Sequence, residues 1–453
     1  MSTIYTKLVS KVLFPLHEKM KGHDTVKIRN KMEKQQWWSR DNLEKLRVQR
    51  LRRLLMSAGN KVPYYCDLFA KLEFDPKTVE SVDDIQALPF LTKNIIRENF
   101  EKLKAKDARN LSKFNTGGSS GEPLSFYISR ERVSHDVAAK WRATTWWNVD
   151  IGDPEVVVWG SPIELGAQDK IKHVLDKLFR TTLFSAFDIT DRTIEEFITL
   201  LKTIKPKMLF GYPSSIAYMA SYAERKNIVV SNLGIKVVFV TSERLYDNQR
   251  ETISRIFSCP VANGYGGRDA GFIAHECPSG GIHITADDII VEIVDNNDNV
   301  LPLGESGEIV VTHLATSDYP FIRYKTGDVG ILDENTCSCG RTLPLLKEIQ
   351  GRTTDFVIAK NGTVMHGLSL IYVIRELAGI ETFKIVQESI DKTTLTLVVT
   401  NEFDKKNETL ICREYKKMLG ELVQIDIQYV SSIAREKSGK FRYITSNVTA
   451  GTV

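Results

Sequence analysis

The segment with the clearest chemical potential is rich in glycine and in hydroxyl side chains. Glycines let consecutive backbone N–H groups turn inward, and hydroxyls add further donors, so that such a loop can hold phosphate oxygens. The segment FNTGGSSGEPLSFYIS, Phe114–Ser129, therefore predicts a phosphate-binding loop. Its centre consists of six consecutive residues: Thr116, Gly117, Gly118, Ser119, Ser120 and Gly121.

Other loop types share part of this pattern. GGSSG fits the G-x-S-x-G turn that presents a nucleophilic serine, here Ser119, but that turn lies between a strand and a helix. Here Pro123 and the strand-like LSFYIS follow instead. A Walker A loop needs G-K-[ST] before a helix, which the segment lacks. A surface turn without a ligand is the remaining alternative for the string taken alone.

Cysteine and histidine side chains suggest a second kind of chemistry. Zinc prefers four tetrahedral ligands from Cys and His, and a C-x-C pair can join a distant Cys and His that a β-rich segment brings close. The predicted structural zinc ligands are Cys277, His283, Cys337 and Cys339. His275 is the alternative to His283 as the fourth ligand, and reduced thiols in unrelated turns, without a metal, are the other interpretation. The cysteines expected only to pack are Cys66, Cys259 and Cys412.

Three apolar runs predict the strands that would position such sites. They are EVVVWG at Glu155–Gly160, KMLFGY at Lys207–Tyr212 and KVVFVTS at Lys236–Ser242. Unalternating runs of this kind are typical of parallel strands buried on both faces. Amphipathic stretches between them, such as RTIEEFITLLKTI from Arg192, predict helices. The pattern is α/β, with sites expected at the carboxyl ends of the strands.

The remaining segments predict the domain organisation. Residues 1–100 are mostly helical, and Ser39 is a plausible cap for a helix in which arginines alternate with leucines. That basic helix could lie on a membrane, but a solvated outer face is the simpler interpretation. The stretch 281–333 is rich in strands, and a smaller α+β unit follows a hinge near Arg352–Asp355. We therefore expect a domain of residues 1–353 and a second of residues 354–453.

With these elements in order, the chain resembles the adenylate-forming superfamily, whose phosphate loop is Thr/Ser/Gly-rich. It resembles most the phenylacetate–CoA ligase branch and its relatives in polysaccharide biosynthesis. The resemblance implies a large ATP-binding domain with parallel sheets and a β-rich part, and a small α+β lid. Five further motifs follow in the family's order: VTSERLYD from Val240, NGYGGRDAG at Asn263–Gly271, YKTGDVG at Tyr324–Gly330, GRTTD at Gly351–Asp355 and SGKFR at Ser438–Arg442.

The resemblance also implies roles for residues in these motifs. Tyr265 would stack on adenine, Asp328 would bind the ribose hydroxyls, and Arg352 would lie near the ribose. Asp269 would help to hold magnesium, and Lys440 would be the catalytic lysine. Three more residues belong to the implied nucleotide site: Ser242, Asn263 and Gly266.

One position departs from the family pattern. Asp269 stands where the family usually has glutamate, so the carboxylate is withdrawn by about one methylene while its charge is kept. Arg268 beside it is a feature of the polysaccharide-linked relatives. In the family the acyl pocket lies beside the strand ends, and aromatic lining would suit an aryl or apolar acid. The implied pocket residues are Trp159, Gly160, Tyr212 and Pro213.

These assignments imply activation of a carboxylic acid by Mg-ATP as an acyl-adenylate with release of pyrophosphate. The acceptor would be coenzyme A, giving a thioester. Amide or ester formation on a sugar or other amine during polysaccharide assembly is the alternative. A non-catalytic nucleotide- and zinc-binding interaction protein is a third hypothesis, from a different class.

Composition excludes several other classes of protein. The chain has 453 residues, 42% hydrophobic and 26% charged, and a net charge of +4 is too small to mark a nucleic-acid binder. No apolar run approaches the roughly 18–20 residues of a membrane helix, and no secretion signal is evident. We therefore expect a cytoplasmic protein with reduced cysteines and small-molecule partners. The oligomeric state stays open, with a homodimer as one expectation.

Overall fold

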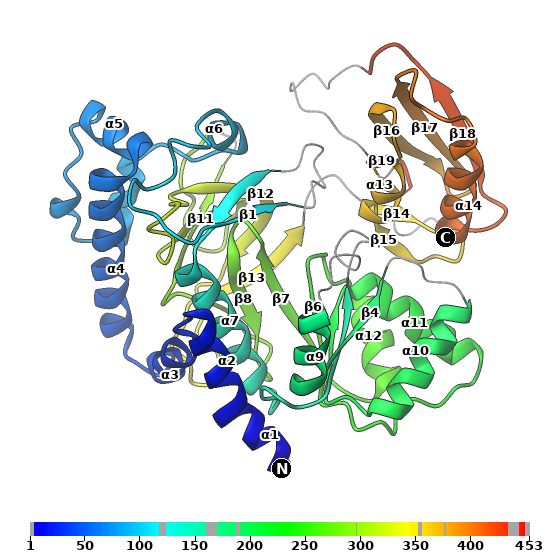
Figure 1. Ribbon diagram of the computed structural model, residues 1–453, viewed down its shortest axis with the longest axis horizontal. Coiled ribbons are helices and arrows are strands. Elements are labelled where there is room, and N and C mark those ends of the chain that lie inside the picture. The colour runs from blue at the N-terminus through cyan, green and yellow to red at the C-terminus, as the bar shows by residue number, and fades with distance from the viewer. Residues whose placement is uncertain are drawn as a thin grey trace.

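The computed structural model describes residues 4–116, 124–159, 170–186, 191–295, 297–351, 356–375, 377–433 and 444–448. Figure 1 shows a helical N-terminal region, a large sheet with helices packed against it, and a smaller C-terminal unit. Among the described residues, no helix combines the length and apolar character needed to cross a membrane.

The large sheet has eleven described strands and combines a parallel with an antiparallel half. Strands β4, β3, β5, β6 and β7 are parallel neighbours. From β7 onward the pairing is antiparallel, through β8, β9, β13, β12, β11 and β10. The parallel strands are β3 Glu155–Trp159, β4 Thr181–Ser185, β5 Met208–Gly211, β6 Val237–Thr241 and β7 Val261–Gly267. The others are β8 Gly271–Glu276, β9 Ile282–Ile284, β10 Ile289–Val294, β11 Ser306–His313, β12 Tyr324–Leu332 and β13 Leu345–Gly351.

Burial on both faces explains the unalternating apolar runs. In β6, Phe239 belongs to the core shared with the N-terminal helices, whereas Val238 and Val240 belong to the core under the helices of the other face. Both sets of side chains leave water, so neither face can be polar. The prediction of three parallel strands and of an α/β class is confirmed, and the antiparallel strand-rich stretch continues the same sheet.

Helices cover this sheet and form most of the N-terminal region. Ser39 caps α4, because its hydroxyl accepts a hydrogen bond from the Asn42 N–H at 3.3 Å. The N-terminal helices are α1 Ile4–Leu8, the π-helical turn η1 Val9–Leu13, α2 Phe14–Lys21, α3 Thr25–Gln35, α4 Arg40–Lys61, α5 Pro63–Lys71, the 3-10 turns η2 Pro76–Thr78 and η3 Val82–Ala87, and α6 Lys93–Glu98. Those beside the sheet are α7 Arg130–Thr145, α9 Lys170–Phe179, α10 Asp191–Ile204, α11 Pro213–Arg225 and α12 Asp247–Phe257.

The C-terminal unit has its own sheets and its own apolar core. In its larger sheet, β16 pairs antiparallel with β17, and β18 and β19 flank them in parallel. Its elements are β14 Phe356–Ile358, β15 Val364–His366, α13 Leu368–Arg375, β16 Ile380–Ser389, β17 Lys392–Val399, α14 Asn407–Leu419, β18 Gln424–Tyr429 and β19 Ile444–Ser446. A separate hairpin of the large domain pairs β1 Ser112–Asn115 with β2 Ser125–Ile128.

Candidate active site and metal centre

The turn between β7 and β8 carries the carboxylate predicted to hold magnesium. Asp269 is nearly buried, and its Oδ2 accepts a hydrogen bond of 2.6 Å from the hydroxyl of Tyr324, the first residue of β12. A Cβ at Gly267 would lie 2.7 Å from Asp269 Oδ1, so glycine leaves that second oxygen approachable. Magnesium commonly binds to proteins through one or two carboxylates and keeps several waters, which this donor set fits.

The predicted adenine and ribose ligands contact each other directly. The hydroxyl of Tyr265, in β7, donates to Oδ2 of Asp328, in β12, at 3.0 Å. Gly327 precedes Asp328 with a φ of +83°, a backbone conformation that favours glycine. The backbone of the TGD motif, Thr326–Asp328, thus directs the Asp328 carboxylate toward the Tyr265 ring, which extends from the glycine-rich strand β7. An aromatic ring beside a carboxylate could hold a nucleoside, with the ring on the base and the carboxylate on the ribose diol.

Glycines in the NGYGGRDAG motif permit the tight β7–β8 hairpin. A Cβ at Gly266 would lie 2.3 Å from the carbonyl oxygen of Gly271, a backbone atom that cannot move aside easily. Gly271 itself has a φ of +85°. Asn263, earlier in β7, is held by its N–H, which donates to Glu276 Oε2 at 2.8 Å. The motif therefore fixes the backbone from which Tyr265 and Asp269 extend.

A buried arginine that the sequence did not single out holds this turn from behind. Arg132, in α7, donates from Nη1 to the Asp269 carbonyl and from Nη2 to the Arg268 carbonyl, both at 2.9 Å. Its Nε faces Asp136 Oδ2 at 3.3 Å, and Asp136 also contacts His313 Nε2 at 3.3 Å. Burial opposes ionisation of Asp136, but the charges of Arg132 and His313 outweigh it and hold its pKa below the usual value.

We expect Arg132→Lys to destabilise the protein by about 2 kcal/mol, because an ammonium cannot reproduce the planar fork that satisfies two carbonyls. Denaturant unfolding measures the change. Arg130→Lys, an exposed position on the same helix, is the matched control and should shift the midpoint little. Equal midpoints for the two variants would contradict this role of Arg132.

The predicted acyl-pocket residues lie at the carboxyl ends of parallel strands, where aromatic rings adjoin. Trp159, at the end of β3, stacks on Tyr212 with ring centroids 4.5 Å apart, and Phe210 in β5 is stacked on Phe239 in β6 at 5.9 Å. Pro213 begins α11 directly after Tyr212. Among the described residues, these rings form an aromatic wall, which we define as Trp159, Tyr212, Phe210 and Phe239. Phe210 and Phe239 are buried, so only Trp159 and Tyr212 expose part of their ring surface.

Two further predicted nucleotide ligands lie at the edges of this region. Thr116 closes the base of the glycine-rich loop, because its hydroxyl accepts from the Leu124 N–H and its own N–H donates to the Leu124 carbonyl, both at 2.9 Å. Ser242 follows β6 with a φ of +71°, a strained conformation that often marks a functional position. The remaining predictions lie outside the described residues: Gly117, Gly118, Ser119, Ser120, Gly121, Gly160, Arg352 and Lys440.

Four residues far apart in the sequence come together in a metal-ligand cluster, which we define as Cys277, His283, Cys337 and Cys339. Their ligand atoms all lie within 4.8 Å of one another. The Sγ atoms of Cys277 and Cys337 are 3.6 Å apart, and Cys339 Sγ is 3.2 Å from His283 Nε2. Tetrahedral zinc at its usual bond lengths would separate such atoms by about 3.5–3.8 Å.

The surroundings of the cluster suit a metal. His283 Nδ1 lies 3.3 Å from the Leu343 carbonyl, a contact that would leave Nε2 as the ligand atom. A Cβ at Gly281 would lie 2.6 Å from Cys337 Sγ, so glycine is needed there. Without a metal, burial raises the pKa of Cys277 to about 12 and lowers the pKa of His283 to about 4. A bound metal would therefore have to displace the Cys277 proton.

The alternative ligand His275 takes a different position. Its ring stacks on Phe272 at 5.5 Å and is tilted against Phe239 at 5.8 Å. Burial lowers its pKa to about 3, so that it is neutral at pH 7. Among the described residues, His275 belongs to the aromatic core beside the site and His283 to the cluster.

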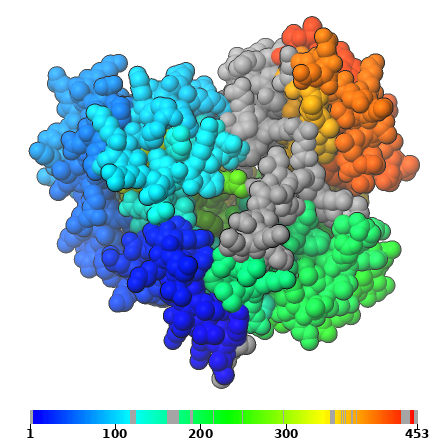
Figure 2. Space-filling model, viewed as in Figure 1, coloured from blue at the N-terminus to red at the C-terminus, as the bar shows by residue number. Residues whose placement is uncertain are grey.

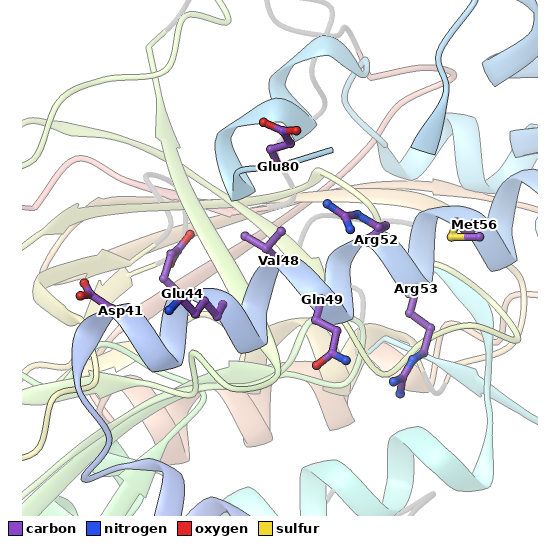
Figure 3. A pocket seen from close by; sticks show the side chains of 9 residues that line it. Asp41, Glu44, Val48, Gln49, Arg52, Arg53, Met56 and Glu80 are labelled. Carbon is purple, nitrogen blue, oxygen red and sulfur yellow. The ribbon is translucent and has the colours of Figure 1, made fainter. Parts of the chain in front are cut away.

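The outer face of α4 carries a shallow depression of about 770 Å³ that contains none of the predicted site residues. Figure 3 shows acidic and basic side chains side by side around it. Two arginines near it have protein partners: Arg47 pairs with Glu44 at 2.7 Å, and Arg52 Nε donates to the Val79 carbonyl at 3.0 Å. This mixed-charge face agrees with the simpler interpretation, a solvated outer face. The lining residues are Asp41, Glu44, Lys45, Val48, Gln49, Arg52, Arg53, Met56 and Glu80.

Known proteins resemble the chain in sequence. Residues 357–447 match the family described as the CapK C-terminal domain. The chain is 27% identical to protein CapK of Staphylococcus aureus over 413 residues, 90% of either chain. It is 24% identical to a phenylacetate–coenzyme A ligase of Thermus thermophilus, over 72% of this chain and 74% of that one.

Solved structures share the fold. A 2-hydroxyisobutyryl-CoA ligase in complex with 2-HIB-AMP and CoA superimposes with a TM-score of 0.67 at 19% identity, covering 91% of each chain. The same ligase in its postadenylation state gives a TM-score of 0.60 at 20% identity, again over 91% of each chain. The sequence relatives and the structural neighbours include proteins of the same kind, CoA ligases. The chain is thus similar in sequence to CapK and to the phenylacetate–coenzyme A ligases, and it shares its fold with the 2-hydroxyisobutyryl-CoA ligase.

Proposed function

We propose that the chain uses Mg-ATP to convert a carboxylic acid into an acyl-adenylate, releasing pyrophosphate, and then transfers the acyl group to coenzyme A. The observation that carries this proposal is a pair of hydrogen bonds that join the β7–β8 hairpin to β12, from Tyr265 to Asp328 and from Tyr324 to Asp269. A nucleoside held by Tyr265 and Asp328 would place its phosphates within the reach of a magnesium ion at Asp269.

Each residue has a separable task in this proposal. Asp328 accepts hydrogen bonds from a ribose diol, and Tyr265 offers its ring face to the base. Asp269 would hold magnesium, which when bound neutralises phosphate charge. Tyr324 fixes one oxygen of Asp269, so that the carboxylate presents a set direction before nucleotide binds. Trp159 and Tyr212, the partly exposed rings of the aromatic wall, support an aryl or apolar acid as substrate, since burial of an apolar acyl group against them would be favourable.

We further propose that residues 354–453 act as a mobile lid that brings Lys440 to the reacting groups. A separate apolar core supports this division, because such a unit can turn without exposing the core of the large domain. A lysine suits the task, since its compact charge could stabilise the negative charge that accumulates at the α-phosphate and then withdraw.

The second candidate acceptor is an amine or hydroxyl of a sugar, giving an amide or ester. It is supported by the resemblance of the motifs to relatives in polysaccharide biosynthesis, of which Arg268 is a feature. Both acceptors would attack the same adenylate, so the first half-reaction is common to the two proposals.

Exchange of labelled pyrophosphate into ATP tests the first half-reaction over a panel of aryl, short aliphatic and hydroxy acids. We expect at least one acid to support exchange, and we expect Lys440→Ala to lower it by about 100-fold. Lys405→Ala, an exposed lysine of the same C-terminal unit, is the control and should exchange at the wild-type rate.

Each part of the proposal has its own contrary result. Exchange by Lys440→Ala at the wild-type rate would remove the catalytic assignment. No exchange with any acid would favour the non-catalytic nucleotide-binding alternative. Once an acid is found, adding coenzyme A or amino sugars and identifying the products by mass separates the two acceptors.

A further inference from the structure

The first helical segment of the chain presents an apolar row to the outside. We define the N-terminal rod as Ile4–Lys21, that is α1, η1 and α2. Five aliphatic side chains spaced four residues apart are exposed along it: Ile4 by 90%, Leu8 by 45%, Val12 by 51%, Leu16 by 56% and Met20 by 79%. At about 1.5 Å per residue the row is roughly 25 Å long.

The π-helical turn η1 helps to keep this row on one side. Residues four apart drift by about 40° per step around a regular α-helix, so a long row would wind around it. The wider turn of Val9–Leu13 rotates less per residue and counteracts that drift. The spacing of apolar residues and the helical irregularity therefore act together.

Specific contacts hold the opposite side of the rod against the protein. Val9 and Phe14 are buried with Trp141 of α7. Thr6 Oγ1 donates to Asp153 Oδ1 at 3.0 Å, and the Tyr5 hydroxyl donates to the α9 carbonyl of Leu178 at 2.9 Å. The outward direction of the apolar row is thus a consequence of how the inner side packs.

Lysines flank the row, and the rod itself carries no exposed acidic side chain. Lys7, Lys11, Lys19 and Lys21 are all exposed. Glu18 is the single acidic residue between Ile4 and Lys21, and it is buried, where Thr25 donates to it and His23 contacts it at 3.1 Å. The rod therefore presents aliphatic side chains between positive charges, which differs from the mixed charges on α4.

We propose that the N-terminal rod docks on the surface of an anionic lipid bilayer. An interfacial helix of this kind buries its apolar face at the acyl boundary while lysines contact anionic headgroups. A second copy of the chain is a poorer occupant, because a two-fold interface through this row would place the same lysines against one another.

The position of the rod leaves the rest of the molecule accessible. In Figure 1 it lies at the lower edge of the molecule, away from the C-terminal unit at the top. Figure 2 shows it as a ridge, in dark blue, at the lower edge of the visible face. Docking through this ridge would leave the C-terminal unit in water.

Co-sedimentation of the full chain with vesicles tests the proposal, using equal parts of phosphatidylcholine and phosphatidylglycerol or phosphatidylcholine alone. We expect binding to the anionic vesicles at low salt, and at least tenfold weaker binding to neutral vesicles or at high salt. Replacing Leu8, Val12 and Leu16 together by serine should weaken binding by at least about tenfold. Lys7→Glu with Lys11→Glu should do the same, at about fivefold or more per lysine.

The matched control replaces three exposed apolar residues elsewhere, Val229, Leu303 and Leu422, by serine and should bind like the wild type. Far-UV circular dichroism and a thermal melt establish that each variant is folded. Three results would overturn the proposal: no binding of the wild type to anionic vesicles, equal binding by the rod variants, or a dimer in solution that the triple rod variant dissociates. The last would assign the row to a second copy instead.

Discussion

Asp269→Asn is expected to lower pyrophosphate exchange by about 100-fold or more, with little loss of stability. The amide keeps the size of the side chain, and its oxygen can still accept the hydrogen bond that Tyr324 now donates to Oδ2 at 2.6 Å. What the substitution removes is the negative charge at the proposed magnesium position. The loss should be largest at low magnesium and should shrink as magnesium is raised.

Two companion variants separate charge from geometry. Asp269→Glu restores the residue usual in the family and keeps the charge, so it should retain exchange within about tenfold of the wild type. Tyr324→Phe removes only the hydroxyl that orients the carboxylate, and a loss of up to about tenfold is expected. The carboxylate would have another role if Asp269→Asn kept more than a third of the wild-type exchange rate. The same would follow if Tyr324→Phe exchanged pyrophosphate more slowly than Asp269→Asn.

The family glutamate and the observed aspartate need not present their oxygens at the same place. Asp269 extends from a hairpin turn whose carbonyls are tied to Arg132, so the backbone cannot easily advance to compensate for the shorter side chain. The kinetics of Asp269→Glu against magnesium concentration thus also report whether this turn is adapted to aspartate.

The sequence could predict those parts of the protein where residue type alone restricts the structure. Burial on both faces demands apolar residues at every position, so β3, β5 and β6 were predicted to within a residue or two. The metal-ligand cluster was predicted as a set, since few residue types can bind zinc. The change from parallel to antiparallel pairing leaves no comparable signal, because the single strand β7 pairs parallel with β6 on one side and antiparallel with β8 on the other.

Long-range polar contacts were beyond prediction for a different reason. Arg132 lies on a helix among other charged residues, and only the packing of α7 behind the β7–β8 turn brings it to the carbonyls of Arg268 and Asp269. Tyr324 stood in a recognised motif, but the role of its hydroxyl depends on how β12 faces that turn. The sequence named His283 as the ligand and His275 as the alternative, and the fold separates them. The two residues are partners in the β8–β9 pairing, but His283 Nε2 lies 3.2 Å from Cys339 Sγ whereas the ring of His275 stacks on Phe272.

Cys277→Ser is expected to release zinc and to lower the free energy of unfolding by at least about 3 kcal/mol. Wild-type protein purified without chelator should contain about one zinc ion per chain, because the three thiols and His283 Nε2 are placed for tetrahedral coordination. Metal analysis and denaturant unfolding give the two readouts. Cys259→Ser, a buried thiol outside the cluster, controls for the cost of a buried hydroxyl and should keep its zinc.

Loss of the metal should also lower the activity of the proposed active site. Cys277 follows β8, His283 lies in β9, and the other two ligands belong to the loop between β12 and β13, so one ion would join three segments of the antiparallel half. The other end of β8 begins just after Asp269. We therefore expect zinc-free protein to exchange pyrophosphate more slowly, and zinc added back to restore the rate in the wild type but not in Cys277→Ser. Less than about half an equivalent of zinc in the wild type, or full zinc in Cys277→Ser, would mean that the thiols serve packing alone.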